Sequence, residues 1–361
     1  MSNFCKFLSQ GLVYNNDTTV ITVSPCCYYA KNYPLTSADQ LVAYRNEWLT
    51  PDPVACRICL DTEAAGQPSY RQASFDLGDS SNQIKMLTVA VNKQCNLACA
   101  SCDAGSSSFW YQENQRTGQE QTQRIHQLHQ ENRAGVTDKQ FVELLSKVDL
   151  SQLEYIKFGG GEPLMSSTHE QILQLIPNPS RVTVQYTSNF SIMPTRRVMD
   201  QWSRFQLIKW VASIDGVKEQ FEFLRWPYKW DKLTEFTANA IATVPGNVMF
   251  GVEHTLNPLN IYYFDQFQQW FEQNLLKNAY GDLSDFNLHT CHGIMDLANT
   301  PAALREVIRK KYGDNNPVTL ILDKQGYTDS TNSMVEYLDK LDRIRNLDWR
   351  ETFLEVEAYF E

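Results

Sequence analysis

From residue 86 onward, short apolar runs of strand length alternate with stretches whose apolar residues recur at helical spacing. KQFVELLSKV and DQFQQWFEQNLL are two of these helical stretches. Strands and helices that alternate in this way predict parallel β/α units. We therefore expect an α/β fold built on a partial (β/α)6 TIM-type barrel, in which the chemistry takes place at the C-terminal ends of the strands. Six runs are strand candidates: 86–91, 154–158, 181–186, 208–214, 248–256 and 285–290.

The chain divides into three segments by pattern. Residues 84–295 hold the alternating runs and predict the barrel. Residues 1–80 contain short strand-like runs, turns and one helical stretch, so they predict a small separate module, with the polar stretch 78–83 as linker. Residues 296–361 are mostly helical in pattern and predict a C-terminal extension.

The charge balance disfavours one class of partner. The chain has 42 acidic and 32 basic side chains and a net charge of −10, which repels phosphate backbones, so general nucleic-acid binding is not expected. No apolar run approaches the roughly 20 residues that span a bilayer, so no membrane partner is expected. The start, MSNFCKFLSQ, lacks the pattern of a secretory signal, and we expect a cytoplasmic protein.

Eight of the nine cysteines lie within the first 102 residues, and three of them follow the first candidate strand. In VNKQCNLACASCDAG, Cys95, Cys99 and Cys102 are four and three residues apart. Three thiolates on one loop can hold a [4Fe–4S] cluster and leave one iron without a protein ligand. A structural zinc site normally takes four ligands, so a zinc loop fits this spacing less well. The sequence therefore predicts a cluster with an open coordination position.

This spacing after the first strand resembles the signature of the radical S-adenosylmethionine (SAM) superfamily. The resemblance implies that the open iron chelates SAM, which is cleaved reductively to methionine and a 5′-deoxyadenosyl radical that takes hydrogen from a substrate. Ser101 departs from the pattern, because many members carry an aromatic residue there that lies near the adenine.

Two further strand ends carry residues that match the family, and a third, TSN at 187–189, carries polar residues that could also cap the next helix. KFGGGEPL resembles the Gly-Gly-Glu-Pro motif that binds the SAM amino group, with Glu162 as acceptor. SIDG followed by Arg225 resembles the Ser-x-Asp-Gly…Arg arrangement of the peptide-modifying branch, which implies that Ser213 holds the ribose and Arg225 the carboxylate of SAM. A helix cap and a surface arginine are the alternative reading. The cofactor-binding residues so implied are Gly160, Gly161, Glu162, Pro163, Ser188, Asn189, Ser213, Asp215 and Arg225.

The N-terminal cysteines form a second group. Four soft ligands fit either a fully ligated [4Fe–4S] cluster or a zinc ion, and sequence chemistry alone does not separate the two. The pattern Cys…Cys-Cys…Cys-x-x-Cys, followed by Glu63, Gly66, Ser69 and Arg71, resembles the auxiliary-cluster module called twitch, a shortened SPASM domain. The resemblance favours the cluster. The expected ligands are Cys5, Cys26, Cys56 and Cys59, with Cys27 as the alternative to Cys26 because neighbours in a strand face opposite ways.

Cys291 stands apart from both groups, at the end of the sixth candidate strand, with His289 and His292 beside it. A buried inert thiol is the common reading of a lone cysteine. Its position near the expected substrate region makes a catalytic role the alternative.

Taken with the resemblance, these motifs predict an enzyme that uses SAM to abstract hydrogen from a peptide or protein. The same chemistry on a small molecule, such as a nucleoside, sugar or cofactor precursor, is the first alternative. A zinc-binding scaffold without catalysis is the second, although such a scaffold has no need of three glycines and Glu162 beside the cysteine loop. The resemblance also implies an electron donor such as flavodoxin or ferredoxin as a partner.

Overall fold

The computed structural model describes residues 5–15, 21–64, 66, 69–73, 82–90, 92–134, 136–275, 286–328 and 330–360. Within them, nine strands form one mostly parallel sheet in the order β3-β2-β1-β4-β5-β6-β7-β8-β9. The strands are β1 Gly11–Asn15, β2 Thr22–Ser24, β3 Tyr33–Pro34, β4 Met86–Ala90, β5 Tyr155–Gly159, β6 Thr183–Ser188, β7 Leu207–Ser213, β8 Val248–Leu256 and β9 Phe286–Thr290.

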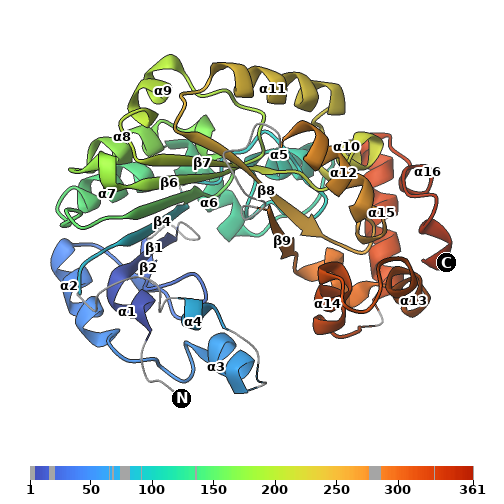
Figure 1. Ribbon diagram of the computed structural model, residues 1–361, viewed down its shortest axis with the longest axis horizontal. Helices are drawn as coiled ribbons and strands as arrows, with labels where there is room; N and C mark the ends of the chain where they lie inside the picture. The colour runs from blue at the N-terminus through green and yellow to red at the C-terminus, as the bar shows by residue number, and fades with distance from the viewer. Residues whose placement is uncertain are drawn as a thin grey trace.

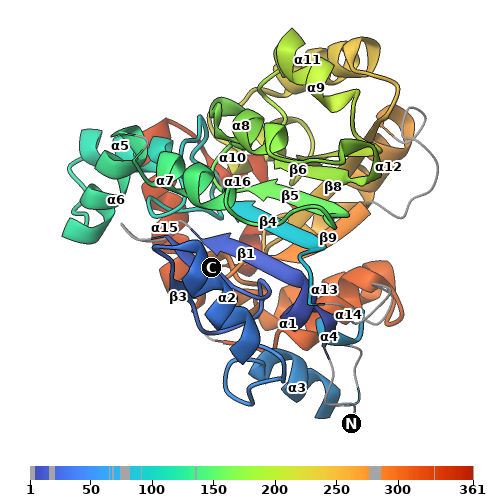
Figure 2. The same ribbon diagram turned by 90° about the vertical axis from the view of Figure 1, so that its left-hand side faces the viewer.

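The six predicted strands are confirmed as β4 to β9, and each pairs in parallel with the next. The curved sheet is open in the described residues, with β3 and β9 at its edges, and helices cover its outer face (Figures 1 and 2). The helices up to the last strand are α1 Lys6–Gln10, α2 Ala38–Glu47, α3 Arg57–Ala64, α4 Tyr70–Ala73, α5 Ser108–Arg116, α6 Gln123–Ala134, α7 Val136–Leu145, α8 Thr168–Gln174, α9 Arg196–Trp202, α10 Lys218–Leu224, α11 Trp230–Thr243 and α12 Phe264–Asn274.

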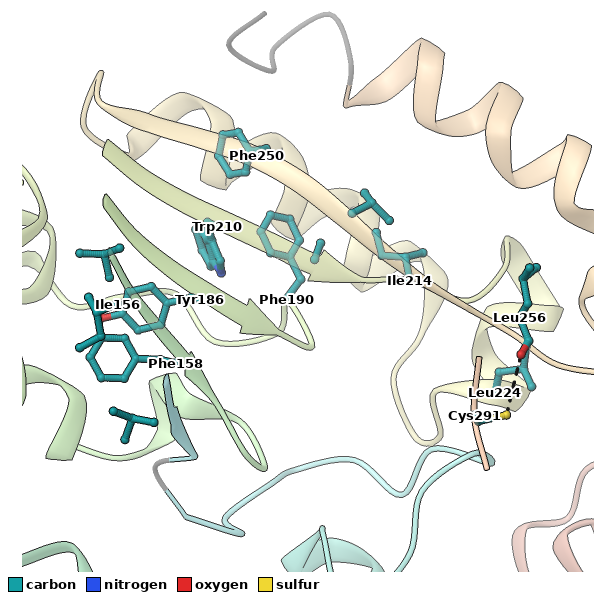
Figure 3. Packing of buried hydrophobic residues seen from close by; sticks show 14 of the residues in the cluster. Ile156, Phe158, Tyr186, Phe190, Trp210, Ile214, Leu224, Phe250, Leu256 and Cys291 are labelled. Atoms are coloured by element: carbon teal, nitrogen blue, oxygen red, sulfur yellow. Dashed lines mark hydrogen bonds between the residues drawn. The ribbon is translucent and has the colours of Figure 1, made fainter. Parts of the chain in front are cut away.

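The two faces of the sheet differ in character because successive side chains of a strand point to opposite sides. Phe158, Tyr186, Trp210 and Phe250 are buried among the helices of the outer face (Figure 3). The alternate positions carry polar side chains that are only partly covered. Glu253 lies 3.3 Å from both Lys157 and Thr187, measured from its Oε1 to their Nζ and Oγ1. The inner face is therefore polar and the outer face is the core.

The N-terminal segment differs from the sequence expectation, because its strands join the same sheet. β1 pairs in parallel with β4, with Leu12 opposite Leu87, and β2 and β3 continue the sheet as antiparallel strands. Tyr14 is buried and stacks on Phe141 of α7, with ring centroids 3.6 Å apart. Burial of apolar side chains on the outer face thus stabilises β1 in the same sheet as β4, so β1 to β3 do not form a separate sheet. Of the expected linker 78–83, residues 78–81 lie outside the described part.

The region after residue 296 is helical, as the sequence predicts. Its helices are α13 Ala302–Tyr312, α14 Pro317–Lys324, α15 Thr331–Arg345 and α16 Trp349–Thr352, and they follow β9 at the far edge of the sheet (Figure 1). Across the described ranges, no helix combines the length and the apolar character that crossing a membrane requires.

Candidate functional site

The loop after β4 carries Cys95, Cys99 and Cys102, and residues at the start of α5 hydrogen-bond to it. The backbone N–H of Cys95 donates to the Ser108 hydroxyl at 3.0 Å. The Ser107 hydroxyl donates to Leu97 O at 2.6 Å and also caps α5 by accepting from two backbone N–H groups. The indole N–H of Trp110 donates to Cys99 O at 2.8 Å. The helix that begins at Ser108 therefore fixes the path of the cysteine loop.

The three thiols of this loop lie close enough to influence one another. Burial, together with the neighbouring Cys99 and Cys95, raises the pKa of Cys102 to about 12. Burial likewise raises the pKa of Cys95 to about 11. In the parts of the chain that the structure describes, no group of three His, Cys, Asp or Glu side chains is arranged to hold a metal ion. The thiolates of a [4Fe–4S] cluster bind separate irons, and three thiols on one loop are the donor set that such a cluster uses.

The glycines after β5 lie directly against this loop. The backbone N–H of Gly161 donates to Asn92 O at 2.8 Å, and that of Glu162 donates to Gln94 O at 2.6 Å. A Cβ atom on Gly161 would lie 2.1 Å from Gln94 O, so no larger residue fits there. Gly160 has a φ of 111°, a conformation that only glycine adopts readily. The glycines thus allow two backbones to meet at the strand end.

Glu162 hydrogen-bonds extensively to its own chain. Its residue is fully buried, and burial raises the pKa of its carboxyl to about 7 although its hydrogen bonds lower it. The carboxylate accepts from Ser188 Oγ at 3.0 and 3.1 Å, from Asn189 N at 2.6 Å and from Leu164 N at 3.2 Å. These contacts engage both oxygens, and they tie the end of β5 to the end of β6. Its predicted role as acceptor for the SAM amino group stays a prediction.

Asn189 connects the end of β6 to the cysteine loop. Its side-chain amide donates to Asn96 Oδ1 at 2.8 Å and lies 3.8 Å from Cys95 Sγ. Asn96 in turn donates to the Ser191 hydroxyl at 2.9 Å. Ser188 and Asn189 therefore hold Glu162 and the loop in place.

Arg225 approaches the loop from the other side. The backbone N–H groups of Ala98 and Ala100 donate to Trp226 O and Leu224 O at 2.7 and 2.8 Å, so the two segments run together. Arg225 Nη1 lies 3.7 Å from Cys99 Sγ. Its Nε lies 2.6 Å from Asp215 Oδ2, and the two side chains are 11% and 2% exposed. A buried cation therefore stands beside Cys99, with its charge offset by Asp215.

Of the predicted SAM-binding residues, most meet at this end of the sheet. Asp215 also accepts from Thr255 N at 2.8 Å, which joins the end of β7 to β8. Ser213, the last residue of β7, is partly buried and lies two residues before Asp215. Pro163 begins the short 3-10 helix Pro163–Met165, whose first turn Glu162 caps.

The N-terminal cysteines converge on one small pocket. Cys5, Cys26, Cys56 and Cys59 line it together with aromatic side chains and Arg71. Burial, together with the neighbouring Cys27, Cys5 and Cys59, raises the pKa of Cys26 to about 12. Cys27 is exposed and does not line the pocket. The geometry thus places Cys26, and not Cys27, with the other three.

The residues that follow these cysteines in the predicted motif form one network beside the pocket. Glu63 accepts from Ser69 Oγ at 2.5 Å and from Arg71 Nε at 3.0 Å. The side chains of Arg71 and Glu63 are 3% and 6% exposed. Arg71 therefore lines the pocket with its positive charge already offset by Glu63. Gly66 has a φ of 72°, as a tight turn requires.

Cys291 belongs to neither cysteine group, although Asp215, the partner of Arg225, is among the charges that raise its pKa. Its thiol is 2.7 Å from Met295 O and 3.8 Å from Leu256 O, and burial raises its pKa to about 12 (Figure 3). His292 is largely exposed and lies 3.7 Å from Asp296, whereas His289 lies 3.7 Å from Glu253 on the inner face. The thiol is thus buried and close to two backbone carbonyls, and its catalytic role stays a prediction.

Several residues of the site carry no motif and were missed from the sequence. Gln94 and Asn96 flank Cys95 and join the loop to the segments after β5 and β6. Trp110 supports Cys99 from α5 through its indole N–H. Tyr337 and Arg345 reach the same region from α15, and no sequence spacing points to them.

No family model matches the chain, and no curated protein matches it. Among solved structures it is similar to anSMEcpe with bound AdoMet, at 14% identity and a TM-score of 0.40, covering 70% of this chain and 65% of that one. It is also similar to Streptococcus suis SuiB bound to S-adenosylmethionine, at 12% identity and a TM-score of 0.35, covering 63% and 44%. TYW1 with a lysine-pyruvate adduct bound gives 15% identity and a TM-score of 0.31, covering 64% and 72%. The chain thus spans less than two thirds of the first two, and TM-scores below 0.5 assign it to no family.

Proposed function

We propose that this chain is a radical SAM enzyme that binds a [4Fe–4S] cluster through Cys95, Cys99 and Cys102. The observation that carries the proposal is the set of direct contacts around the cysteine loop. The segments after β5 and β6 and the segment after α10 all hydrogen-bond to it, and each contains a motif that the sequence had singled out. When bound, the cluster supplies one electron for the reductive cleavage of SAM.

The chain's own residues contribute position and charge to this chemistry. Gly160 and Gly161 let the end of β5 approach the loop, and Glu162 fixes that end through its buried carboxylate. Arg225 adds a positive charge beside Cys99, where it offsets the charge of thiolates and can pair with an anionic group of the ligand. Ser213 at the end of β7 is our proposed contact to the ribose.

The proposal is tested on protein reconstituted anaerobically with iron and sulfide. With dithionite and SAM, it is expected to release 5′-deoxyadenosine, which liquid chromatography measures. Iron-loaded protein that releases none above the level of a protein-free control would refute the proposal.

We further propose a peptide or protein as substrate. The support is the match of Ser213, Asp215 and Arg225 to the peptide-modifying branch and a polar inner face, where Glu253 and Lys157 meet. An extract of the source cells separates this from the alternative of a small molecule. If the substrate is a peptide, the extract raises 5′-deoxyadenosine formation, and treating it with protease removes the effect. An effect that survives protease and passes a dialysis membrane would favour the small molecule.

Arg225→Lys is expected to weaken SAM binding while the protein keeps its iron. Lysine still offsets Asp215, 2.6 Å from the present guanidinium, but it loses the planar fork that suits a carboxylate. Charge-assisted hydrogen bonds are worth about 1.5–3 kcal/mol, so affinity should fall by roughly 10- to 150-fold. Calorimetry on anaerobic, iron-loaded protein measures the change. Unchanged affinity would remove Arg225 from the SAM site.

The pocket of Cys5, Cys26, Cys56 and Cys59 is our proposed site for an auxiliary cluster, with zinc as the alternative. We expect Cys56→Ala to lose roughly four irons per chain, because Cys56 lines the pocket. The matched control is Cys27→Ala, which alters an exposed thiol one residue from Cys26 and should keep all of the iron. Iron and zinc are measured by elemental analysis. One zinc per chain in the wild type, lost in Cys56→Ala, would establish the zinc site instead.

A further inference from the structure

A helix of the C-terminal extension reaches the cysteine loop from behind. The Tyr337 hydroxyl on α15 donates to Ala100 O at 2.7 Å, between Cys99 and Cys102. This single hydrogen bond joins residues that are 237 positions apart in the chain. Ala100 N donates on its other side to Leu224 O at 2.8 Å, so both backbone polar groups of this loop residue are engaged.

A second connection between α15 and the cysteine loop runs through α5. On α5, Trp110 and Glu113 are three residues apart and so share a face. Arg345 of α15 donates to Glu113 at 2.8 Å from Nη2 and 3.3 Å from Nε, and the two side chains are 0% and 2% exposed. The Arg345 guanidinium also stacks on the Trp110 ring, 4.6 Å from its centroid. The same indole donates to Cys99 O.

We propose that α15 is a clasp for the catalytic cysteine loop, with Tyr337 and Arg345 as positioning residues for the cluster. The inference rests on the proposed function for its consequence, although not for its contacts. Tyr337 fixes the carbonyl between two ligands directly, and Arg345 fixes the Trp110 indole that holds the carbonyl of Cys99. A buried bidentate pair is rigid because breaking it leaves a charge without compensation.

The second arm of the same extension strengthens this assignment. Phe353, which follows α16, packs edge to face on Phe223 of α10, with ring centroids 5.6 Å apart. The end of α10 leads into Arg225 and the backbone that pairs with Ala98 and Ala100. The C-terminal extension thus supports both sides of the cysteine loop.

The test uses three variants and one matched control. Tyr337→Phe removes a single hydroxyl. Glu113→Gln combined with Arg345→Met removes both charges of the ion pair. No uncompensated buried charge is left, and such a charge would itself be strongly destabilising. Arg345→Met alone shows the cost of that uncompensated charge. Arg343→Met is the control, because Arg343 lies on the same helix but is exposed.

Two readouts separate the clasp from the proposed function. In protein without iron, hydrogen–deuterium exchange of a peptide covering 95–107 is expected to be roughly five- to tenfold faster in Tyr337→Phe and in the double variant, the effect of one lost buried hydrogen bond. Exchange elsewhere and in Arg343→Met should match the wild type. In iron-loaded, reduced protein, the SAM-induced change in the electron paramagnetic resonance spectrum should be weaker or altered in the same variants.

Each outcome decides something. Unchanged exchange over 95–107 in both variants overturns the clasp, whatever the wild type does with SAM. Faster exchange over the whole chain also overturns it, because that result marks general destabilisation. Faster exchange confined to 95–107 supports the clasp even if the wild type never responds to SAM, in which case it is the proposed function that fails.

Discussion

Replacing Cys95, Cys99 and Cys102 together with alanine is expected to abolish the release of 5′-deoxyadenosine. The three thiols are the only cysteines of the loop that the ends of β5 and β6 and the Arg225 segment contact, so no other described thiol is placed to substitute for them. Iron should fall by roughly four per chain. Product release is measured with dithionite and SAM on protein reconstituted in parallel with the wild type.

The pocket of N-terminal cysteines serves as the internal control of this experiment. If it holds a cluster, the triple variant keeps the iron of that cluster and its visible absorbance, which shows that reconstitution worked and that the chain is folded. Release of 5′-deoxyadenosine at the wild-type rate by the triple variant would refute the proposal that these three cysteines bind the catalytic cluster. Loss of all iron would show that the two sites do not load independently.

The strands of the repeat could be predicted because the physics that forms them is local. In β5, Ile156 and Phe158 are fully buried while Lys157 between them is not, and this alternation is visible in the sequence. Parallel strands present their C-terminal ends on one side, so motifs after consecutive strands are expected to meet. The contacts of Gly161 and Asn189 with the cysteine loop follow that expectation.

Other features depend on pairings that spacing does not encode. β1 lies beside β4, and Leu12 is opposite Leu87, although the sequence favoured a separate N-terminal module. Arg345 and Glu113 are 232 residues apart, and either one alone reads as a surface charge on a helix. Glu162 was recognised by its motif, yet its partners are the Ser188 hydroxyl and the backbone N–H groups of Asn189 and Leu164, whose directions depend on how β5 and β6 end. The residue type of Glu162 predicted a hydrogen-bond acceptor, but no local feature of the sequence predicted which groups would donate to it.

Gly161→Ala is expected to prevent loading of the proposed catalytic cluster, and the reason is steric. The added methyl group would lie 2.1 Å from Gln94 O, 2.7 Å from Gln94 C and 2.9 Å from Lys93 C. These are backbone atoms of the segment that leads into Cys95, so no flexible side chain can move aside. Either the turn after β5 or the cysteine loop must shift, and both hydrogen bonds that join them, from Gly161 N and Glu162 N, are put at risk.

The matched control for this substitution is two residues away. A Cβ atom on Gly159 would meet nothing within 4 Å, so Gly159→Ala adds the same methyl group to the same strand end without the clash. Overpacking of this kind costs about 1–3 kcal/mol. This cost lowers the equilibrium constant for the present loop conformation roughly 5- to 150-fold. We therefore expect Gly161→Ala to lose the iron of the three-cysteine site while Gly159→Ala retains it. Equal iron content in the two variants would mean that the close approach of β5 to the loop is not what positions the three thiols.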